Sequence, residues 1–314
     1  MLLEDSWLRE TYVDLLIEYA KKDNRVVIVE ADLMKAAGTV RFGSELPERT
    51  VNVGVQEANM IGVAAGMSAM GKIPFTHTFT PFSTRRVCDQ VTLSVAYAGL
   101  NVKIMGSDPG VTAELNGGTH MSMEDVAIMR NIPNMVIYEP VDSAQLKKLF
   151  PQILEHYGPV YIRLLRRNAV QIFDDSYDFK LGKGTVLKEG KDVTVIASGI
   201  MVAEALKAEK VLAGKGIDAE IINIHTIKPL DEELVLESAK KTGAVVTAEN
   251  HSILNGLGGA VAEFLSENYP VPVQRVGVKD HFGEVGFTEF LKEKYGLTEK
   301  EIIQAAQKAI SLKR

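Results

Sequence analysis

Short apolar runs rich in β-branched residues alternate along the whole chain with longer amphipathic segments. The runs are almost continuously apolar, as strands are when helices cover both faces of their sheet. Strand–helix alternation of this kind is typical of parallel βαβ units. The chain is therefore predicted to be an α/β protein with two doubly wound domains, each a mostly parallel sheet flanked by helices.

The predicted elements fall into two groups. In the first half, strands are expected at 26–33, 50–55, 73–79, 101–108, 134–142 and 159–166, and helices near 7–22, 57–71, 83–98, 122–130 and 143–156. In the second half, strands are expected at 193–199, 218–227, 244–250 and 272–278, and helices near 201–214, 231–241, 257–268, 287–294 and 298–312. The stretch 167–192 is polar and turn-rich, which indicates a linker. The predicted boundaries are 1–175 for the first domain, 176–190 for the linker and 191–314 for the second domain.

Composition excludes several classes of protein. A length of 314 residues with 46% hydrophobic residues suits two globular domains and excludes a disordered chain. The net charge of −6 argues against nucleic-acid binding, which favours a basic excess. The single cysteine, Cys88, cannot form an internal disulfide, and the acidic N-terminus lacks the pattern of an export signal. No apolar run approaches the roughly 20 residues that cross a membrane. A soluble cytoplasmic protein is expected.

Ligands of open parallel sheets bind beyond the carboxyl ends of the strands. In the first half these ends carry a mixed set of polar and aromatic candidates: Asp32, Glu57, Phe79, Phe82, Asp108, His120, Asp142, Arg166 and Arg167. In the second half they carry Ser198, His225 and the segment 249–260.

Each candidate has a structural as well as a functional interpretation. Glu57 fits a carboxylate that the helix dipole stabilises, or a buried carboxyl whose raised pKa lets it share a proton. Phe79 and Phe82 fit a packed core, or rings that face a ligand across the loop made by Pro81. His120, after the run NGGT, fits a substrate contact or a helix cap. Arg166 and Arg167 follow a strand, where a guanidinium can bind phosphate.

Other motifs favour a structural interpretation. The run NGLGGA at 255–260 matches neither the dinucleotide fingerprint nor the P-loop, so close packing at a helix start is expected. His225 and His251 are isolated, which is typical of core or surface histidines. No pattern of metal ligands is present, so no metal site is expected.

At 51–79, the segment VNVGVQEANMIGVAAGMSAMGKIPFTHTF resembles the pyrimidine-binding segment of transketolases, with its G-[IV]-x-E motif and aromatic-bearing strand. The segment MEDVAIMRNIPNMVIYEPVD at 123–142 and VYIRLLRRN at 160–168 are similar to later blocks of the same family. The resemblance covers essentially the whole chain, as a pyrimidine-binding domain followed by a transketolase C-terminal domain.

Full-length transketolases begin with a further domain that binds the diphosphate and Mg²⁺ through a G-D-G…N segment, which this sequence lacks. The resemblance therefore implies the C-terminal subunit of a split transketolase. Thiamine diphosphate is expected to be shared with a separate N-terminal subunit that alone holds Mg²⁺. A homodimer of this chain within an α₂β₂ assembly is expected.

The resemblance also assigns roles to single residues. Glu57 matches the carboxyl that hydrogen-bonds N1′ of the aminopyrimidine and promotes its imino tautomer, which removes the C2 proton. Phe79 and Phe82 match the aromatic pair on the pyrimidine, and Asp32 an aspartate near the cofactor. Arg166 and Arg9 match arginines that bind a sugar phosphate, and His120 a position that contacts substrate.

Three positions depart from the family pattern. Asp108 stands where well-known members have a substrate-binding histidine, and Asn116 where they have an aspartate that contacts the sugar. Ala36 stands where a phosphate-binding serine is expected. A carboxylate at position 108 would repel a phosphate. All three changes affect expected substrate contacts, so they leave the cofactor chemistry intact but put the sugar substrate in doubt.

The leading interpretation is transfer of a two-carbon ketol unit between sugar phosphates. The alternatives are a 1-deoxyxylulose-5-phosphate synthase, a 2-oxoacid dehydrogenase β subunit, and a non-catalytic partner subunit of a thiamine enzyme. Glu57 argues against the last, because a purely structural subunit does not need a polarising carboxylate.

Overall fold

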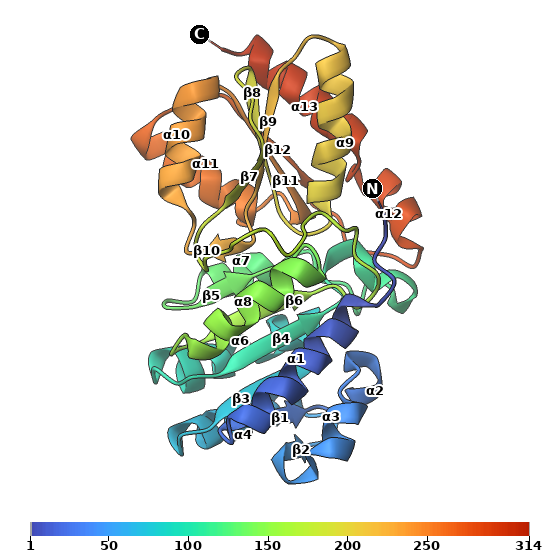
Figure 1. Ribbon diagram of the computed structural model, residues 1–314, viewed down its shortest axis with the longest axis vertical. Coiled ribbons are helices and arrows are strands. Elements are labelled where there is room, and N and C mark those ends of the chain that lie inside the picture. Colours follow the sequence, from blue (N-terminus) through green and yellow to red (C-terminus); the bar gives the residue numbers. More distant parts are fainter. Residues whose placement is uncertain (1, 314) are drawn as a thin grey trace.

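Each half of the chain forms its own mostly parallel sheet, and the two domains lie one above the other along the long axis of the molecule (Figure 1). The computed structural model describes residues 2–313. The predicted fold class is confirmed: two α/β domains, with sheets of seven and five strands, each flanked by helices.

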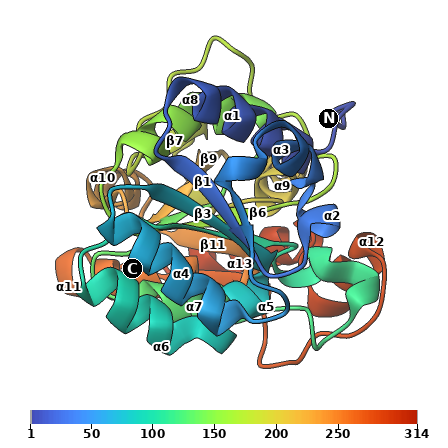
Figure 2. The same ribbon diagram turned by 90° about the horizontal axis from the view of Figure 1, so that it is seen from below.

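The first sheet has the strand order β10-β5-β6-β4-β3-β1-β2. Its strands are β1 (Val26–Glu30), β2 (Thr50–Asn52), β3 (Ile73–Phe79), β4 (Lys103–Ser107), β5 (Val136–Tyr138), β6 (Val160–Leu164) and β10 (Thr226–Lys228). Helices α1 (Leu8–Lys22) and α8 (Ser143–Glu155) cover one face, and α4 (Glu57–Ala69), α6 (Cys88–Gln90) and α7 (Asp125–Arg130) lie on the other (Figure 2). The central strands are buried throughout, as their continuous apolar runs predict.

The second sheet has the strand order β12-β11-β8-β9-β7. Its strands are β7 (Thr185–Lys188), β8 (Val193–Ala197), β9 (Ala219–Asn223), β11 (Val245–Ser252) and β12 (Val273–Val278). The helices of this domain are α9 (Met201–Gly214), α10 (Glu232–Thr242), α11 (Leu257–Asn268), α12 (Thr288–Tyr295) and α13 (Glu299–Ser311). Helices α9 and α13 lie on one side of the sheet, and α10 and α11 on the other (Figure 1).

One strand of the second half pairs with the sheet of the first. The expected strand 218–227 is divided: β9 stays in its own sheet, whereas β10 pairs antiparallel with β5, Thr226 opposite Tyr138. The expected linker 176–190 likewise contains β7, which pairs antiparallel with β9. The domain boundaries at 175 and 190 therefore stay predictions.

Several short elements were not expected from the sequence. They are α2 (Met34–Ala37), α3 (Val40–Glu45), and the 3₁₀ segments η1 (Pro47–Arg49) and η4 (Gly110–Asn116). The single helix expected near 83–98 is instead broken into α5 (Thr80–Ser83), η2 (Arg85–Val87), α6 and a π-helical segment, η3 (Val91–Tyr97). Within 2–313, every helix is too short or too polar to span a bilayer.

Candidate active site

The carboxyl ends of β3 and β4 form a rigid base for the aromatic candidates. Helix α5 follows β3 directly and is fixed to β4 by a hydrogen bond of 2.6 Å from the Thr80 hydroxyl to the Ser107 carbonyl oxygen. A Cβ atom at Gly106 would lie 2.7 Å from the Tyr161 hydroxyl oxygen and 3.2 Å from the Cα atom of Thr80, so glycine allows a close approach of α5 to β4. Helix α5, which carries Phe82, is therefore held close to the end of β4.

Three rings predicted to face a ligand lie against one another. The ring centroids of Phe79 and Phe82 are 6.3 Å apart, and His120 lies edge-on to both, at 5.7 Å from Phe79 and 5.2 Å from Phe82. The His120 Nδ1 atom is 2.8 Å from the Thr119 hydroxyl oxygen. His120 thus belongs to the aromatic cluster at the end of β3, where it can contact a ligand that reaches these rings.

Glu57 is the first residue of α4, and its carboxylate is buried with 4% of the residue exposed. Arg86 Nη1 donates to both carboxylate oxygens at 3.1 Å. The Arg86 guanidinium also lies over the Phe82 ring, 4.1 Å from its centroid. Glu57 is therefore joined to the aromatic cluster through an arginine that the sequence analysis did not identify.

The backbone between Phe82 and Arg86 is not continuously helical. Thr84 has φ −125° and ψ −82°, outside helical values, and separates α5 from η2. The Arg86 guanidinium nevertheless lies over the ring of Phe82, four residues earlier. The spacing of four between an aromatic residue and an arginine was the available sequence signal, but it predicts contact only where the backbone is locally helical.

The Glu57 carboxylate and the Phe82 ring together fit an aminopyrimidine. They already hold one planar group with N–H donors, the guanidinium of Arg86, by a hydrogen bond at its edge and an aromatic ring at its face. An aminopyrimidine uses two similar contacts, a carboxyl group in its plane that shares a proton with the ring nitrogen N1′ and an aromatic ring on its face. The roles of Glu57, Phe79 and Phe82 toward thiamine diphosphate stay predictions that this geometry supports.

Arginines gather at the ends of β4 and β6, around Asp108. Arg166 Nε is 3.2 Å from Asp108 Oδ2, and the charges of Arg9 and Arg167 also act on this carboxyl. Burial raises the pKa of Asp108 to about 6, and the pairing with Arg166 limits the rise. Asp108 thus faces an arginine, and it lowers the positive charge available to an anionic ligand there.

Arg9 approaches this cluster from α1. Its Nη1 donates 2.6 Å to the carbonyl oxygen of Ala36, and its guanidinium stacks on Trp7, 4.4 Å from the ring centroid. Burial and the nearby charge of Arg166 lower the pKa of Arg9. The predicted pair Arg9 and Arg166 is therefore brought together, with the main chain of Ala36 beside it.

Other predicted residues lie apart from these contacts. Asp32 is exposed, has φ +61°, and its backbone N–H is 3.1 Å from the Asn52 side-chain oxygen. Asn116, at the end of η4, is also exposed. Asp142 is the N-cap of α8 and accepts hydrogen bonds from three backbone N–H groups, so its role is structural.

The glycine run at 255–260 begins α11, and a carboxylate of the protein already fills the helix N-terminus. Glu249 accepts from the backbone N–H of Leu257 at 2.7 Å and of Gly258 at 2.8 Å, and burial raises its pKa to about 7. The expected structural role is therefore supported, and this helix start has no room for a phosphate. His225 and His251 are buried, and burial lowers the pKa of each to about 4.

A buried polar network joins the two domains near the site. Arg163 pairs with Asp125 at 2.7 Å and with Glu139 at 2.6 Å, and donates to the carbonyl oxygen of Asn250 in β11 at 2.6 Å. Ser198, a candidate from the second half, donates to Glu139 at 2.8 Å. These charges satisfy one another, which explains how they are tolerated in the interior.

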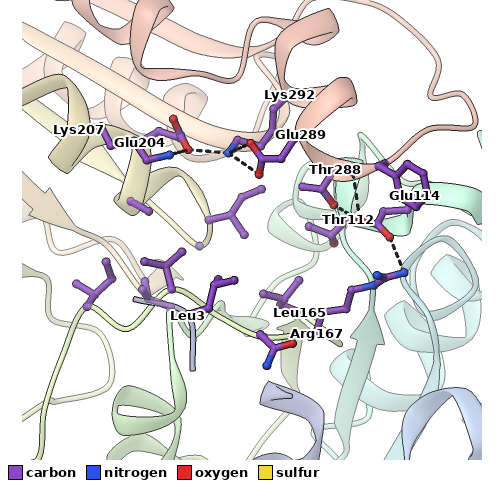
Figure 3. A pocket seen from close by; sticks show the side chains of 18 residues that line it. Leu3, Thr112, Glu114, Leu165, Arg167, Glu204, Lys207, Thr288, Glu289 and Lys292 are labelled. Carbon is purple, nitrogen blue, oxygen red and sulfur yellow. Dashed lines mark hydrogen bonds and ion pairs between the residues drawn. The ribbon is translucent and has the colours of Figure 1, made fainter. Parts of the chain in front are cut away.

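A cavity of about 350 Å³ lies between the domains (Figure 3). Its charged side chains are mutually paired: Glu204 with Lys207 and Lys292, and Arg167 with Glu114 at 2.6 Å. Arg167, a candidate phosphate ligand, is thus held by a carboxylate here. Residues 2–313 contain no group of three or more histidine, cysteine or acidic side chains arranged to bind a metal.

Both halves of the chain match known protein families. The family described as "Transketolase, pyrimidine binding domain" matches residues 7–171, and "Transketolase, C-terminal domain" matches 182–302. The 6-deoxy-6-sulfo-D-fructose transketolase subunit SqwH of Clostridium sp. (strain MSTE9) is 68% identical over 99% of this chain and 97% of that protein. One subunit of the apulose-4-phosphate transketolase of Phocaeicola vulgatus is 36% identical over 95% of this chain and 96% of that protein. A solved split-gene transketolase, described as an inactive β4 tetramer, has a TM-score of 0.90 at 47% identity and covers 98% and 99% of the two chains.

Proposed function

The chain belongs to the transketolase family, and we propose that it is one subunit of a two-subunit transketolase that uses thiamine diphosphate and a sulfosugar donor. The relatives described as subunits support a partner, which supplies the part of the cofactor site that binds diphosphate and Mg²⁺. A homodimer of this chain within an α₂β₂ assembly is part of the proposal.

Glu57, Phe79 and Phe82 are the residues that hold the pyrimidine. Thiamine diphosphate, when bound, supplies the nucleophilic carbon that carries the two-carbon unit from ketose to aldose. Glu57 holds a proton at the ring nitrogen it contacts, and its burial keeps water from competing for that contact. Phe82 and Phe79 orient the ring, and His120 at their edge faces the carbon chain of the sugar.

The donor is proposed to be 6-deoxy-6-sulfofructose, the substrate in the name of the relative that is 68% identical. The reaction breaks the C2–C3 bond of the ketose and forms a bond from the same C2 to the aldehyde carbon of an acceptor. The four-carbon aldose released keeps the sulfonate. Arg166 and Arg9 are the proposed sulfonate ligands.

The observation that carries this substrate is the pairing of Asp108 with Arg166. A sulfonate has one negative charge, whereas a phosphate monoester carries about −1.5 to −2 near pH 7. Arg9, Arg166 and Asp108 together have a net charge of one positive unit when Asp108 is ionised, which balances a sulfonate and undercompensates a phosphate dianion. The departure from the family pattern at position 108 therefore favours the monoanionic donor.

The test is a donor panel with the chain and its partner subunit reconstituted with thiamine diphosphate and Mg²⁺. Glycolaldehyde serves as acceptor because it has no charge that competes for the anion site. We expect kcat/KM to be at least about tenfold higher for 6-deoxy-6-sulfofructose than for fructose 6-phosphate, as expected from one unpaired charge. Equal or reversed values would refute the sulfosugar donor, and turnover of pyruvate with a triose phosphate would favour the synthase alternative.

A further inference from the structure

Arg86 contacts both Glu57 and Phe82. Its guanidinium is bound at the edge by Glu57, with both carboxylate oxygens 3.1 Å from Nη1, and at the face by Phe82, 4.1 Å from the ring centroid. These are the two groups proposed to hold the aminopyrimidine. Arginine and an aminopyrimidine protonated at N1′ thus present the same features to this site: a planar group, an N–H that donates to Glu57 and a face that stacks on an aromatic ring.

Burial of Glu57 explains why such a substitute is needed. Glu57 is 4% exposed, and a buried carboxyl group without a hydrogen-bonding partner is destabilising because it has lost its hydration. Among charged groups of the described chain, Arg86 is the one that forms an ion pair with Glu57. The Arg86 side chain itself is half exposed, so it can move into solvent when another group takes its place.

We propose that Arg86 is an internal substitute for the aminopyrimidine, which holds the Glu57 carboxylate and the Phe82 ring in place and is displaced when thiamine enters. This inference rests on the proposed function, since it concerns the same half-site. It adds that the chain alone binds pyrimidine weakly because the ligand must first break an ion pair and a stacking contact.

Arg85 provides the matched control. It is adjacent in sequence, its side chain is half exposed like that of Arg86, and it pairs with Glu124 at 2.7 Å rather than with Glu57. Arg85→Ala removes an arginine of the same exposure and charge without touching the pyrimidine half-site. A general effect of charge on thiamine binding would therefore appear in both Arg85→Ala and Arg86→Ala, whereas an effect of displacing the arginine from Glu57 would appear in Arg86→Ala alone.

The experiment is titration calorimetry of free thiamine into the full chain, without partner subunit, diphosphate or metal. We expect Arg86→Ala to bind thiamine about tenfold more tightly than wild type, the combined size of one half-exposed ion pair and one cation–π contact. Arg86→Gln, which keeps a hydrogen-bond donor but neither charge nor full stacking, should fall between, and Arg85→Ala should match wild type. Melting temperatures without ligand identify any variant that fails to fold.

Two results would overturn the inference. Unchanged or weaker thiamine binding in both folded Arg86 variants would show that Arg86 supports the ligand rather than replaces it. A structure of the thiamine complex with Arg86 still on Glu57 would do the same. Either result leaves the proposed function intact if the reconstituted complex still transfers ketol units. Conversely, absence of the expected donor preference would refute the proposed function and would leave the thiamine-binding data on Arg86 unaffected.

Discussion

Asp108→Asn tests the electrostatic basis of the proposed substrate. The change keeps the shape of the side chain and removes one negative charge beside the Arg166 guanidinium, 3.2 Å from Nε. Asp108 has a pKa of about 6, so at about pH 7.5 the wild-type carboxyl is mostly ionised and the substitution removes close to one full charge.

The magnitude follows from Coulomb's law. Two unit charges about 5 Å apart interact by about 3 kcal/mol at an effective dielectric constant of about 20. A phosphate dianion experiences this repulsion up to about twice as strongly as a sulfonate, because it carries up to about two charges. Asp108→Asn should remove half to all of the extra repulsion that the phosphate experiences. The ratio of kcat/KM for fructose 6-phosphate to kcat/KM for 6-deoxy-6-sulfofructose should therefore rise by about 10- to 100-fold.

The assay is the glycolaldehyde-coupled donor panel, run on wild type, Asp108→Asn and the control Asp32→Asn. Asp32 is also an aspartate after a strand with positive φ, but it is exposed and contacts Asn52 instead of the arginines. We expect the donor ratio to change in Asp108→Asn alone. An unchanged ratio in a folded Asp108→Asn protein would refute the charge-balance reasoning, because the isosteric change alters little else.

Two further predictions concern buried carboxyls. Glu57→Gln should slow exchange of the cofactor C2 proton in the reconstituted complex by about 10²–10⁴, the usual size of a general acid–base contribution. Near wild-type exchange, with Glu124→Gln as the surface control, would remove Glu57 from the mechanism. Burial raises the pKa of Glu249 from 4.5 to about 7 in the folded chain, so the folded state keeps this proton to a higher pH than the unfolded state does. The free energy of unfolding therefore falls as pH rises through this window. In urea titrations, Glu249→Gln should therefore gain about 3 kcal/mol relative to wild type between pH 4.5 and about pH 8; parallel pH profiles of the two proteins would contradict this.

Much of the fold was predictable because strands that are buried on both faces have continuously apolar sequences. The strands β1, β3, β4 and β6 coincide with apolar runs, and the helices between them with amphipathic segments. The location of β10 was not predictable, since three residues that follow β9 closely carry no signal of which sheet they join. The broken helix after β3 was also missed, because the kink at Thr84 depends on packing against β4.

The candidate site divides in the same way. Residues at strand ends were identifiable from position alone, and Asp108 and Arg166 meet because β4 and β6 are neighbours. Strand order is a property of the whole sheet, so this ion pair could not be deduced from either segment. Arg86 was missed for a further reason: it contacts Phe82 and Glu57 across the non-helical residue Thr84, where helical spacing does not predict a contact.

The second domain contributes to the site because its residues hold the loop that carries the proposed substrate-binding residues. The loop from Asp108 to His120 is fixed at its start by Asn250, which accepts from the Val111 N–H at 3.0 Å and donates to the Pro109 carbonyl at 2.9 Å.

Further along the same loop, Glu114 has φ +49° and is held by Thr288 of α12, whose hydroxyl donates to it at 2.6 Å. A side chain at Gly118 would collide with the backbone of Gly283, so the domains touch directly beside His120. A non-glycine residue keeps a positive φ only where its surroundings enforce it. The second domain therefore holds the substrate loop in its geometry, and separation of the two domains would release this loop, with His120, while leaving Glu57, Phe79 and Phe82 in place.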